Sequence, residues 1–185
     1  MKRALVVIDV QESFRQRASW AGSSNPEVVK PVRRLTEAFR SAGAQVFWIL
    51  HEEPGTGGVF DPARGFVRLM DGLEPAGSEP LIRKTSHNAF TTTNLQQLLT
   101  TAGITEVTVC GIRTEQCVET TARVASDLGY QVVFVTEATA TNPIEHWDGS
   151  GRTISAREII ERTEYALADR FATIKTVDEV VTSLQ

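Results

Sequence analysis

Short apolar runs rich in β-branched residues recur along the chain and constrain its fold more than any other feature. A strand that is covered on both faces of a parallel sheet has such a continuous apolar pattern. Stretches with helical spacing of apolar residues separate the runs, which predicts strands alternating with helices in a mostly parallel α/β sheet. The runs are Ala4–Ile8, Gln45–Leu50, Leu81–Arg83, Glu106–Cys110, Gln131–Val135 and Ala172–Ile174.

Capping residues predict where several helices begin and end. Asn25 followed by Pro26 predicts a helix start, and that helix is expected to end before Gly43. Residues 53–80 are rich in Gly and Pro and predict a long loop with one short helix near residues 66–70. Further helices are expected at about 93–102, 116–128 and 155–167, and after the capping box of Thr176 and Glu179.

Composition excludes several classes of protein. The 185 residues, 41% of them apolar, are enough for one core, so we expect a single domain over residues 1–185. The net charge of −4 comes from interleaved acids and bases, which argues against a nucleic-acid partner. No apolar run approaches the roughly 20 residues that cross a bilayer, so we expect a cytoplasmic protein that does not bind membranes.

Cysteine and histidine are too sparse to build a disulfide framework or a metal site. Cys110 and Cys117 are the only cysteines, and a reducing compartment fits them. His51, His87 and His146 show no metal-binding spacing, so we expect no metal and no cofactor.

Three chemically capable side chains follow predicted strands directly. Asp9 follows the first strand, Lys84 the third, and Cys117 lies after the glycine turn that ends the fourth. The carboxyl ends of parallel strands share one edge, so all three are expected to meet there. A helix N-terminus would favour the Cys117 thiolate, although a buried cysteine can also be a plain apolar residue. Asp9 alone could be a turn residue and Lys84 a solvated charge.

Three separated segments around these residues form a specific pattern. They are Asp9-Val-Gln-Glu-Ser-Phe14, Lys84 with Asn88-Ala-Phe90 and Thr93-Asn-Leu95, and Gly111-Ile-Arg-Thr-Glu-Gln-Cys-Val118 with Thr121-Ala122 and Gly129. In order and spacing, from about Lys2 to Thr139, the sequence resembles the isochorismatase-like cysteine hydrolases.

The resemblance implies a Rossmann-like three-layer αβα sandwich with a six-stranded sheet and a catalytic triad of Asp9, Lys84 and Cys117. Asp9 would take the thiol proton, and Lys84 would hold Asp9 ionised and help to stabilise the developing thiolate. Cys117 would attack a carbonyl to form a thioester. It also implies a cis peptide bond between Ile112 and Arg113, with the amides of Arg113 and Cys117 forming the oxyanion hole.

Two differences from members of this family narrow the range of expected substrates. Nicotinamidases carry an Asp-x-His metal cluster after the second strand, whereas this chain has only His51 there. Isochorismatases that act on the vinyl ether often lack a working cysteine, so an amide, ureide or carbamoyl C–N bond is favoured. Candidate wall residues of the substrate pocket are Phe14, Trp20, His51, Phe60 and Phe90. Core packing is the alternative for the aromatic residues, and a hydrogen-bonding role behind the site is the alternative for His51.

Other interpretations stay open from the sequence. One is an isochorismatase-type vinyl-ether hydrolase, and another is a binding or assembly protein that keeps the fold without turnover. Arg113 could pair with a substrate carboxylate, point to solvent, or lie in a subunit contact. By resemblance we expect a homo-oligomer, a dimer or a tetramer, in which residues 54–80 and 142–152 help to close a neighbour's pocket.

Overall fold

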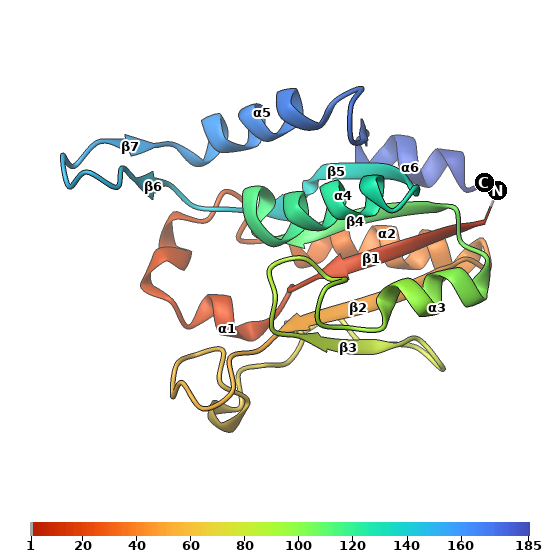
Figure 1. Cartoon of the computed structure of the whole chain (residues 1–185), viewed down its shortest axis with the longest axis horizontal. Coiled ribbons are helices and arrows are strands. Elements are labelled where there is room, and N and C mark those ends of the chain that lie inside the picture. Colours follow the sequence, from red (N-terminus) through yellow and green to blue (C-terminus); the bar gives the residue numbers. More distant parts are fainter. Residues whose placement is uncertain (1) are drawn as a thin grey trace.

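The computed structural model describes residues 2–185 and contains a six-stranded sheet with helices on both faces (Figure 1). All strand pairs of this sheet are parallel, and the order is β3-β2-β1-β4-β5-β8. Its strands are β1 (Arg3–Ile8), β2 (Gln45–His51), β3 (Leu81–Lys84), β4 (Glu106–Ile112), β5 (Gln131–Ala140) and β8 (Thr173–Ile174). The predicted three-layer α/β sandwich is therefore confirmed.

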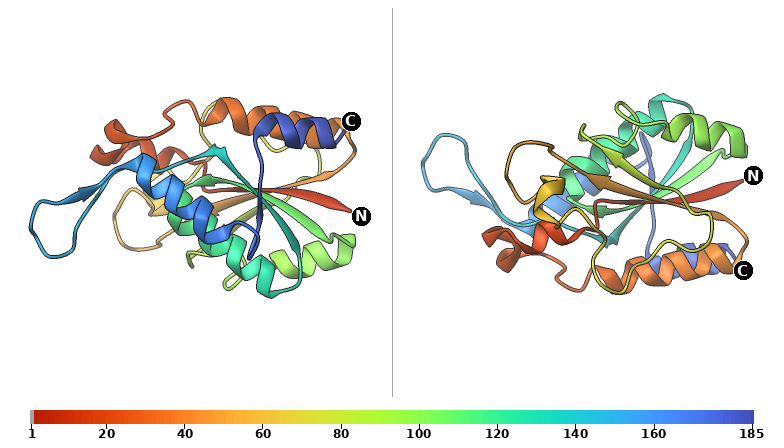
Figure 2. Two further views of the ribbon diagram at one scale, coloured as in Figure 1. Left: turned by 90° about the horizontal axis from the view of Figure 1, so that it is seen from above. Right: turned by 90° about the horizontal axis from the view of Figure 1, so that it is seen from below.

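Two apolar clusters hold the three layers together, one on each face of the sheet. On one face lie α2 (Val29–Ser41) and α6 (Val177–Ser183), and on the other lie α3 (Leu95–Ala102), α4 (Glu119–Asp127) and α5 (Ala156–Leu167) (Figure 2). Alternate residues of β1 enter the two clusters, with Leu5 in one and Val6 in the other. Both faces of the strand are buried, which explains why it is apolar at nearly every position.

The strand order reverses between β1 and β4. From β1 the chain builds outward through β2 to β3, and it then returns to the other side of β1 with β4 and β5. Ligands of open α/β sheets bind beyond the carboxyl ends of the strands at such a reversal. Asp9 at the end of β1 and Ile112 at the end of β4 both lie at this place.

The predicted helix start at Asn25 is wrong. Helix α2 begins at Val29, and the side-chain amide of Asn25 instead donates to the carbonyls of Glu137 (3.0 Å) and Thr139 (3.3 Å). Asn25 therefore ties the segment before α2 to β5. The helix ends at Ser41 and is followed by Gly43 with φ of +67°, as the sequence predicted.

The loop between β2 and β3 also differs from its prediction. Residues 66–70 contain no helix, and the one helical turn is a 3-10 helix at Pro62–Arg64, where the Asp61 side chain accepts from the amide of Ala63 (3.0 Å). After β1 the chain forms α1 (Glu12–Arg15) and a 3-10 helix (Ala18–Gly22). The capping box of Thr176 and Glu179 is present at the start of α6.

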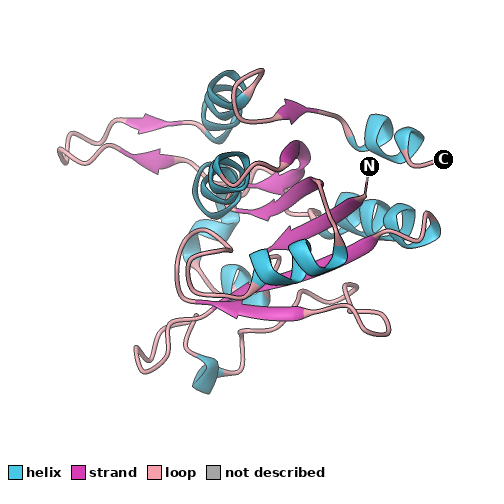
Figure 3. Ribbon diagram, turned by 45° about the vertical axis from the view of Figure 1, so that its right-hand side comes forward, coloured by secondary structure: helices cyan, strands magenta, loops and turns pink. Residues whose placement is uncertain are grey.

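An antiparallel hairpin that the sequence did not predict projects from the body of the molecule (Figure 3). It consists of β6 (Ile144–Glu145) and β7 (Thr153–Ile154), and its tip is held by an ion pair between Asp148 and Arg152 (2.7 Å). Trp147 in this hairpin is 90% exposed. Over residues 2–185, none of the helices has the length and apolar character needed to span a bilayer.

Candidate active site

Asp9 begins the site at the carboxyl end of β1. Its φ of +54° turns the chain out of the strand, in a conformation that aspartate tolerates better than most residues. The amide of Asp9 still donates to the carbonyl of Ile49 (2.9 Å), so the backbone is fixed to β2 up to this point. The carboxylate is completely buried and therefore needs a cation nearby.

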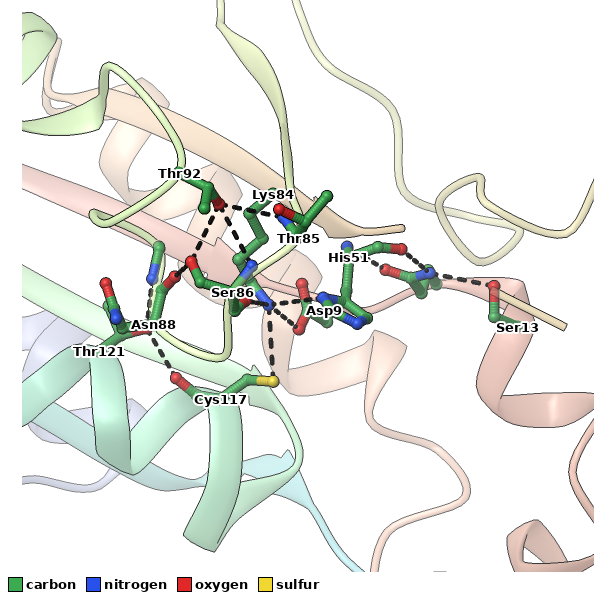
Figure 4. Close-up of polar contacts among 12 residues, drawn as sticks. Asp9, Ser13, His51, Lys84, Thr85, Ser86, Asn88, Thr92, Cys117 and Thr121 are labelled. Atoms are coloured by element: carbon green, nitrogen blue, oxygen red, sulfur yellow. Dashed lines mark hydrogen bonds and ion pairs between the residues drawn. The ribbon is translucent and has the colours of Figure 1, made fainter. Parts of the chain in front are cut away.

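Lys84, the last residue of β3, supplies that cation from two strands away. Strand β2 lies between β3 and β1, and the buried Lys84 side chain reaches past its end. Its Nζ lies 2.8 Å from Oδ2 of Asp9 and 3.5 Å from Sγ of Cys117, and it donates to the carbonyl of Ser86 (3.1 Å) (Figure 4). One ammonium group therefore joins the acid and the thiol.

Cys117 comes from the turn between β4 and α4. The peptide bond between Ile112 and Arg113 is cis, and a π-helical turn at Thr114–Val118 places Cys117 inside it rather than at the start of α4. The hydroxyl of Thr121 donates to the Cys117 carbonyl (2.6 Å) and accepts from the amide of Ala89 (3.1 Å). This hydroxyl links the turn to the loop that follows Lys84.

Burial acts against the thiolate that a helix N-terminus would favour at Cys117. Burial and the charge of Asp9 raise the pKa of Cys117 to about 12, although Lys84 opposes the rise. Burial also raises the pKa of Asp9, against the effect of the Lys84 ammonium. Both shifts favour a thiol over a thiolate at rest, beside a carboxyl group that binds protons more strongly than usual. That arrangement suits proton transfer from sulfur to Asp9 at the moment of attack.

We expect the alkylation of Cys117 by iodoacetamide to accelerate with pH without levelling off between about pH 7 and about pH 10. Below the thiol pKa of about 12 the thiolate is the minor form, so its fraction grows as pH rises. The rate should grow about tenfold per pH unit when the thiolate fraction limits it. Mass spectrometry of the Cys117 peptide measures this rate, and a plateau near neutral pH would mean that the sulfur is already a thiolate at rest.

Both ring nitrogens of His51 have polar neighbours, Lys84 on one side and Glu53 on the other. Its Nδ1 is 3.5 Å from Nζ of Lys84, and its Nε2 is 3.2 Å from Oε1 of Glu53. The side-chain amide of Gln11 clamps its backbone, accepting from the amide of His51 (2.8 Å) and donating to its carbonyl (2.9 Å). Sequence reasoning missed Gln11, although it stands two residues after Asp9 within the matching segment. Of the two interpretations of His51, these contacts favour the hydrogen-bonding one.

The predicted wall residues separate into two groups. Phe14 and Trp20 line one narrow cavity of about 10 Å³ together with Arg113, and Phe14 packs edge-on against Phe60 with ring centroids 5.1 Å apart. Phe90 instead stacks on Tyr130 at 6.2 Å and belongs to the apolar cluster under Cys117. The cavity lies against the peptide bond between Ile112 and Arg113, which places it beside the predicted oxyanion hole.

Glu119, two residues after Cys117, is a structural residue that sequence reasoning overlooked. Its buried carboxylate accepts from Arg123 (2.9 Å), Arg162 (2.6 Å) and the hydroxyl of Thr163 (3.1 Å), and so joins α4 to α5. A glutamate at the start of a helix gave no signal beyond ordinary capping. Within residues 2–185, no group of three His, Cys, Asp or Glu side chains is arranged to hold a metal ion.

Comparison with known proteins places the chain in a family. Residues 3–164 match the model of the isochorismatase domain. The chain is 37% identical over 169 residues to a streptothricin hydrolase from Streptomyces noursei, covering 90% of this chain and 66% of that protein.

Two solved structures have the same fold. A protein of the isochorismatase family from Chromobacterium violaceum superposes with a TM-score of 0.91 at 26% identity, covering 99% of this chain and 93% of that one. An isochorismatase from Pseudomonas putida does so with a TM-score of 0.86 at 31% identity, covering 96% and 89%. The chain therefore belongs to the isochorismatase family and is a hydrolase.

Proposed function

We propose that the chain is a cysteine-dependent hydrolase that cleaves a C–N bond of a small amide, ureide or carbamoyl compound through a covalent thioester. The observation that carries this proposal is the contact of one buried ammonium, that of Lys84, with both Asp9 (2.8 Å) and Cys117 (3.5 Å). The similarity to a streptothricin hydrolase supports hydrolysis, and the chain spans 66% of the length of that protein.

In the proposed mechanism Asp9 acts first as a base and then as an acid. It takes the proton of the Cys117 thiol as the sulfur attacks the carbonyl, and the amides of Arg113 and Cys117 stabilise the oxyanion. Asp9 then protonates the leaving nitrogen, which departs as an amine or ammonia. Water attacks the thioester with Asp9 again as base, and the Cys117 thiol regains its proton. The ammonium of Lys84 balances the charge of Asp9 and of the forming thiolate.

Turnover of a substrate panel tests the proposal. We expect the purified protein to release ammonia or an amine from at least one class among small primary amides, ureides and N-carbamoyl compounds. Coupled assays for ammonia and chromatography of the products measure this release. Cleavage of vinyl ethers with no C–N cleavage anywhere in the panel would contradict the proposal and favour the isochorismatase-type reaction.

We also propose that the protein acts in the cytoplasm as a homo-oligomer, a dimer or a tetramer, and that the β6–β7 hairpin contacts a neighbouring copy. The hairpin projects beyond the sheet and carries Trp147 with 90% of its surface exposed, which is unusual for so large an apolar side chain. Both cysteines are free, as in proteins of a reducing compartment. Light scattering should give a mass above that of one chain, and Trp147→Ser should lower it. A monomer at micromolar concentration would contradict this arrangement.

A further inference from the structure

Arg113 brings a positive charge to the cavity beside the predicted oxyanion hole. The cavity is lined on its other sides by Phe14, Trp20 and the residues Ala140, Thr141 and Asn142. The guanidinium donates weakly to the Thr141 hydroxyl and the Asn142 carbonyl, each at 3.4 Å. A guanidinium beside the predicted oxyanion hole would by itself attract a substrate carboxylate, because its planar fork matches that group.

The guanidinium of Arg113 is already paired with the carboxylate of Glu115. Its Oε1 lies 3.0 Å from Nη2 of Arg113, and the two side chains are only 12% and 11% exposed. Both carboxylate oxygens are shielded from solvent, and neither accepts a hydrogen bond from any other group of residues 2–185. A buried carboxylate without further donors depends on its one cation for compensation. The carboxylate of Glu115 therefore balances the positive charge of Arg113 within the molecule.

We propose that Glu115 is a specificity-determining residue: by neutralising Arg113 it makes the site accept uncharged substrates and reject those with a carboxylate next to the scissile bond. This inference rests on the proposed function, because it takes the surroundings of Arg113 as the place where the substrate of Cys117 binds. An incoming carboxylate has to displace Glu115 or lie beside it, and like charges brought together at a buried site disfavour binding. The substrate class is thereby narrowed to neutral amides, ureides or carbamoyl compounds.

A matched pair of alkylating reagents tests the charge preference without knowledge of the substrate. Iodoacetamide and iodoacetate both react when the Cys117 sulfur attacks the methylene carbon, iodide leaves with its electron pair, and the thiol proton passes to Asp9 or water. They differ only in the neutral amide or the anionic carboxylate that enters beside the sulfur. We expect the wild-type protein to favour iodoacetamide over iodoacetate by a larger factor than free cysteine does at the same pH.

The variant Glu115→Gln should reduce this preference about tenfold or more, since it leaves Arg113 uncompensated while keeping an amide oxygen as hydrogen-bond acceptor. The control is Glu37→Gln on the exposed side of α2, which changes the net charge equally and removes the partner of Arg33 in a 3.8 Å ion pair. That variant should keep the wild-type ratio within about twofold, since exposed ion pairs contribute little.

The outcomes separate the two proposals. If both reagents modify Cys117 and Glu115→Gln leaves their ratio unchanged, the specificity role is wrong and the hydrolase proposal stands. If neither reagent modifies Cys117, both proposals fall. Should Glu115→Gln not fold, the wild-type ratio decides alone, because a preference for iodoacetate above that of free cysteine overturns the role of Glu115.

Discussion

Replacing Cys117 with alanine is expected to abolish C–N bond cleavage while leaving the protein folded. Removing the nucleophile of a covalent mechanism lowers turnover by on the order of 10³-fold or more, because the remaining groups cannot form the thioester. The substitution deletes one sulfur atom from a side chain that is 7% exposed, so it should lower the free energy of unfolding by only about 1–2 kcal/mol. Initial rates on the best substrate of the panel and thermal unfolding measure the two effects.

Cys110→Ala is the matched control for this experiment. Cys110 is completely buried in β4, where burial raises its pKa, and it belongs to the apolar cluster on the opposite face of the sheet from the cluster of Cys117. The same change of side chain there should preserve turnover. If Cys117→Ala keeps its turnover, or if Cys110→Ala loses as much, the thioester mechanism is excluded. Vinyl-ether cleavage that survives Cys117→Ala would instead favour the alternative isochorismatase-type reaction.

Gly111→Ala is expected to have the largest effect on stability, more than about 4 kcal/mol in the free energy of unfolding. Gly111 has φ of +128°, and a Cβ atom built on it would lie 1.8 Å from the carbonyl oxygen of Ile8. That oxygen belongs to backbone that is paired in the centre of the sheet, so it cannot move aside as a flexible side chain would. Strands β1 and β4 would have to separate where they carry Asp9 and the turn to Cys117.

The control Gly43→Ala measures the effect of a positive φ alone, without the steric clash of a new Cβ atom that is expected at Gly111. Gly43 has φ of +67°, and a Cβ atom there would have no neighbour within 4 Å. It should lower the free energy of unfolding by only about 1–2 kcal/mol, the strain of a left-handed residue. Denaturant unfolding, or the soluble yield if Gly111→Ala does not fold, measures both variants. Equal stability of the two would show that the sheet can absorb the extra methyl group.

The meeting of Asp9, Lys84 and Cys117 could be predicted from the sequence, because each follows an apolar run and the carboxyl ends of parallel strands share one edge. The order of the strands could not, since continuous apolar runs carry no pairing information. The path of Lys84 past the end of β2, and the contact with His51 that it creates, therefore emerged only in three dimensions.

The pairing of Arg113 with Glu115 could not be predicted for a different reason. Arg113 and Glu115 both precede the helix that the sequence predicted at about 116–128, and the spacing of residues in a turn does not indicate which side chains meet. The segment instead forms a π-helical turn, which is rare and has no clear sequence signal. The same turn buries Cys117, and this burial raises the pKa of its thiol, which the distance to a helix start did not indicate.

The place of Lys84 on an edge strand has a consequence for how the enzyme fails. Strand β3 is four residues long and pairs only with β2, whereas Asp9 and Cys117 are attached to the central strands β1 and β4. Edge segments open at a lower free energy than the centre of a sheet. Fraying of β3 alone would move the Lys84 ammonium away from Asp9 and Cys117 and leave an unreactive but otherwise native molecule. The free energy of this local opening, and not that of global unfolding, therefore sets the fraction of active molecules.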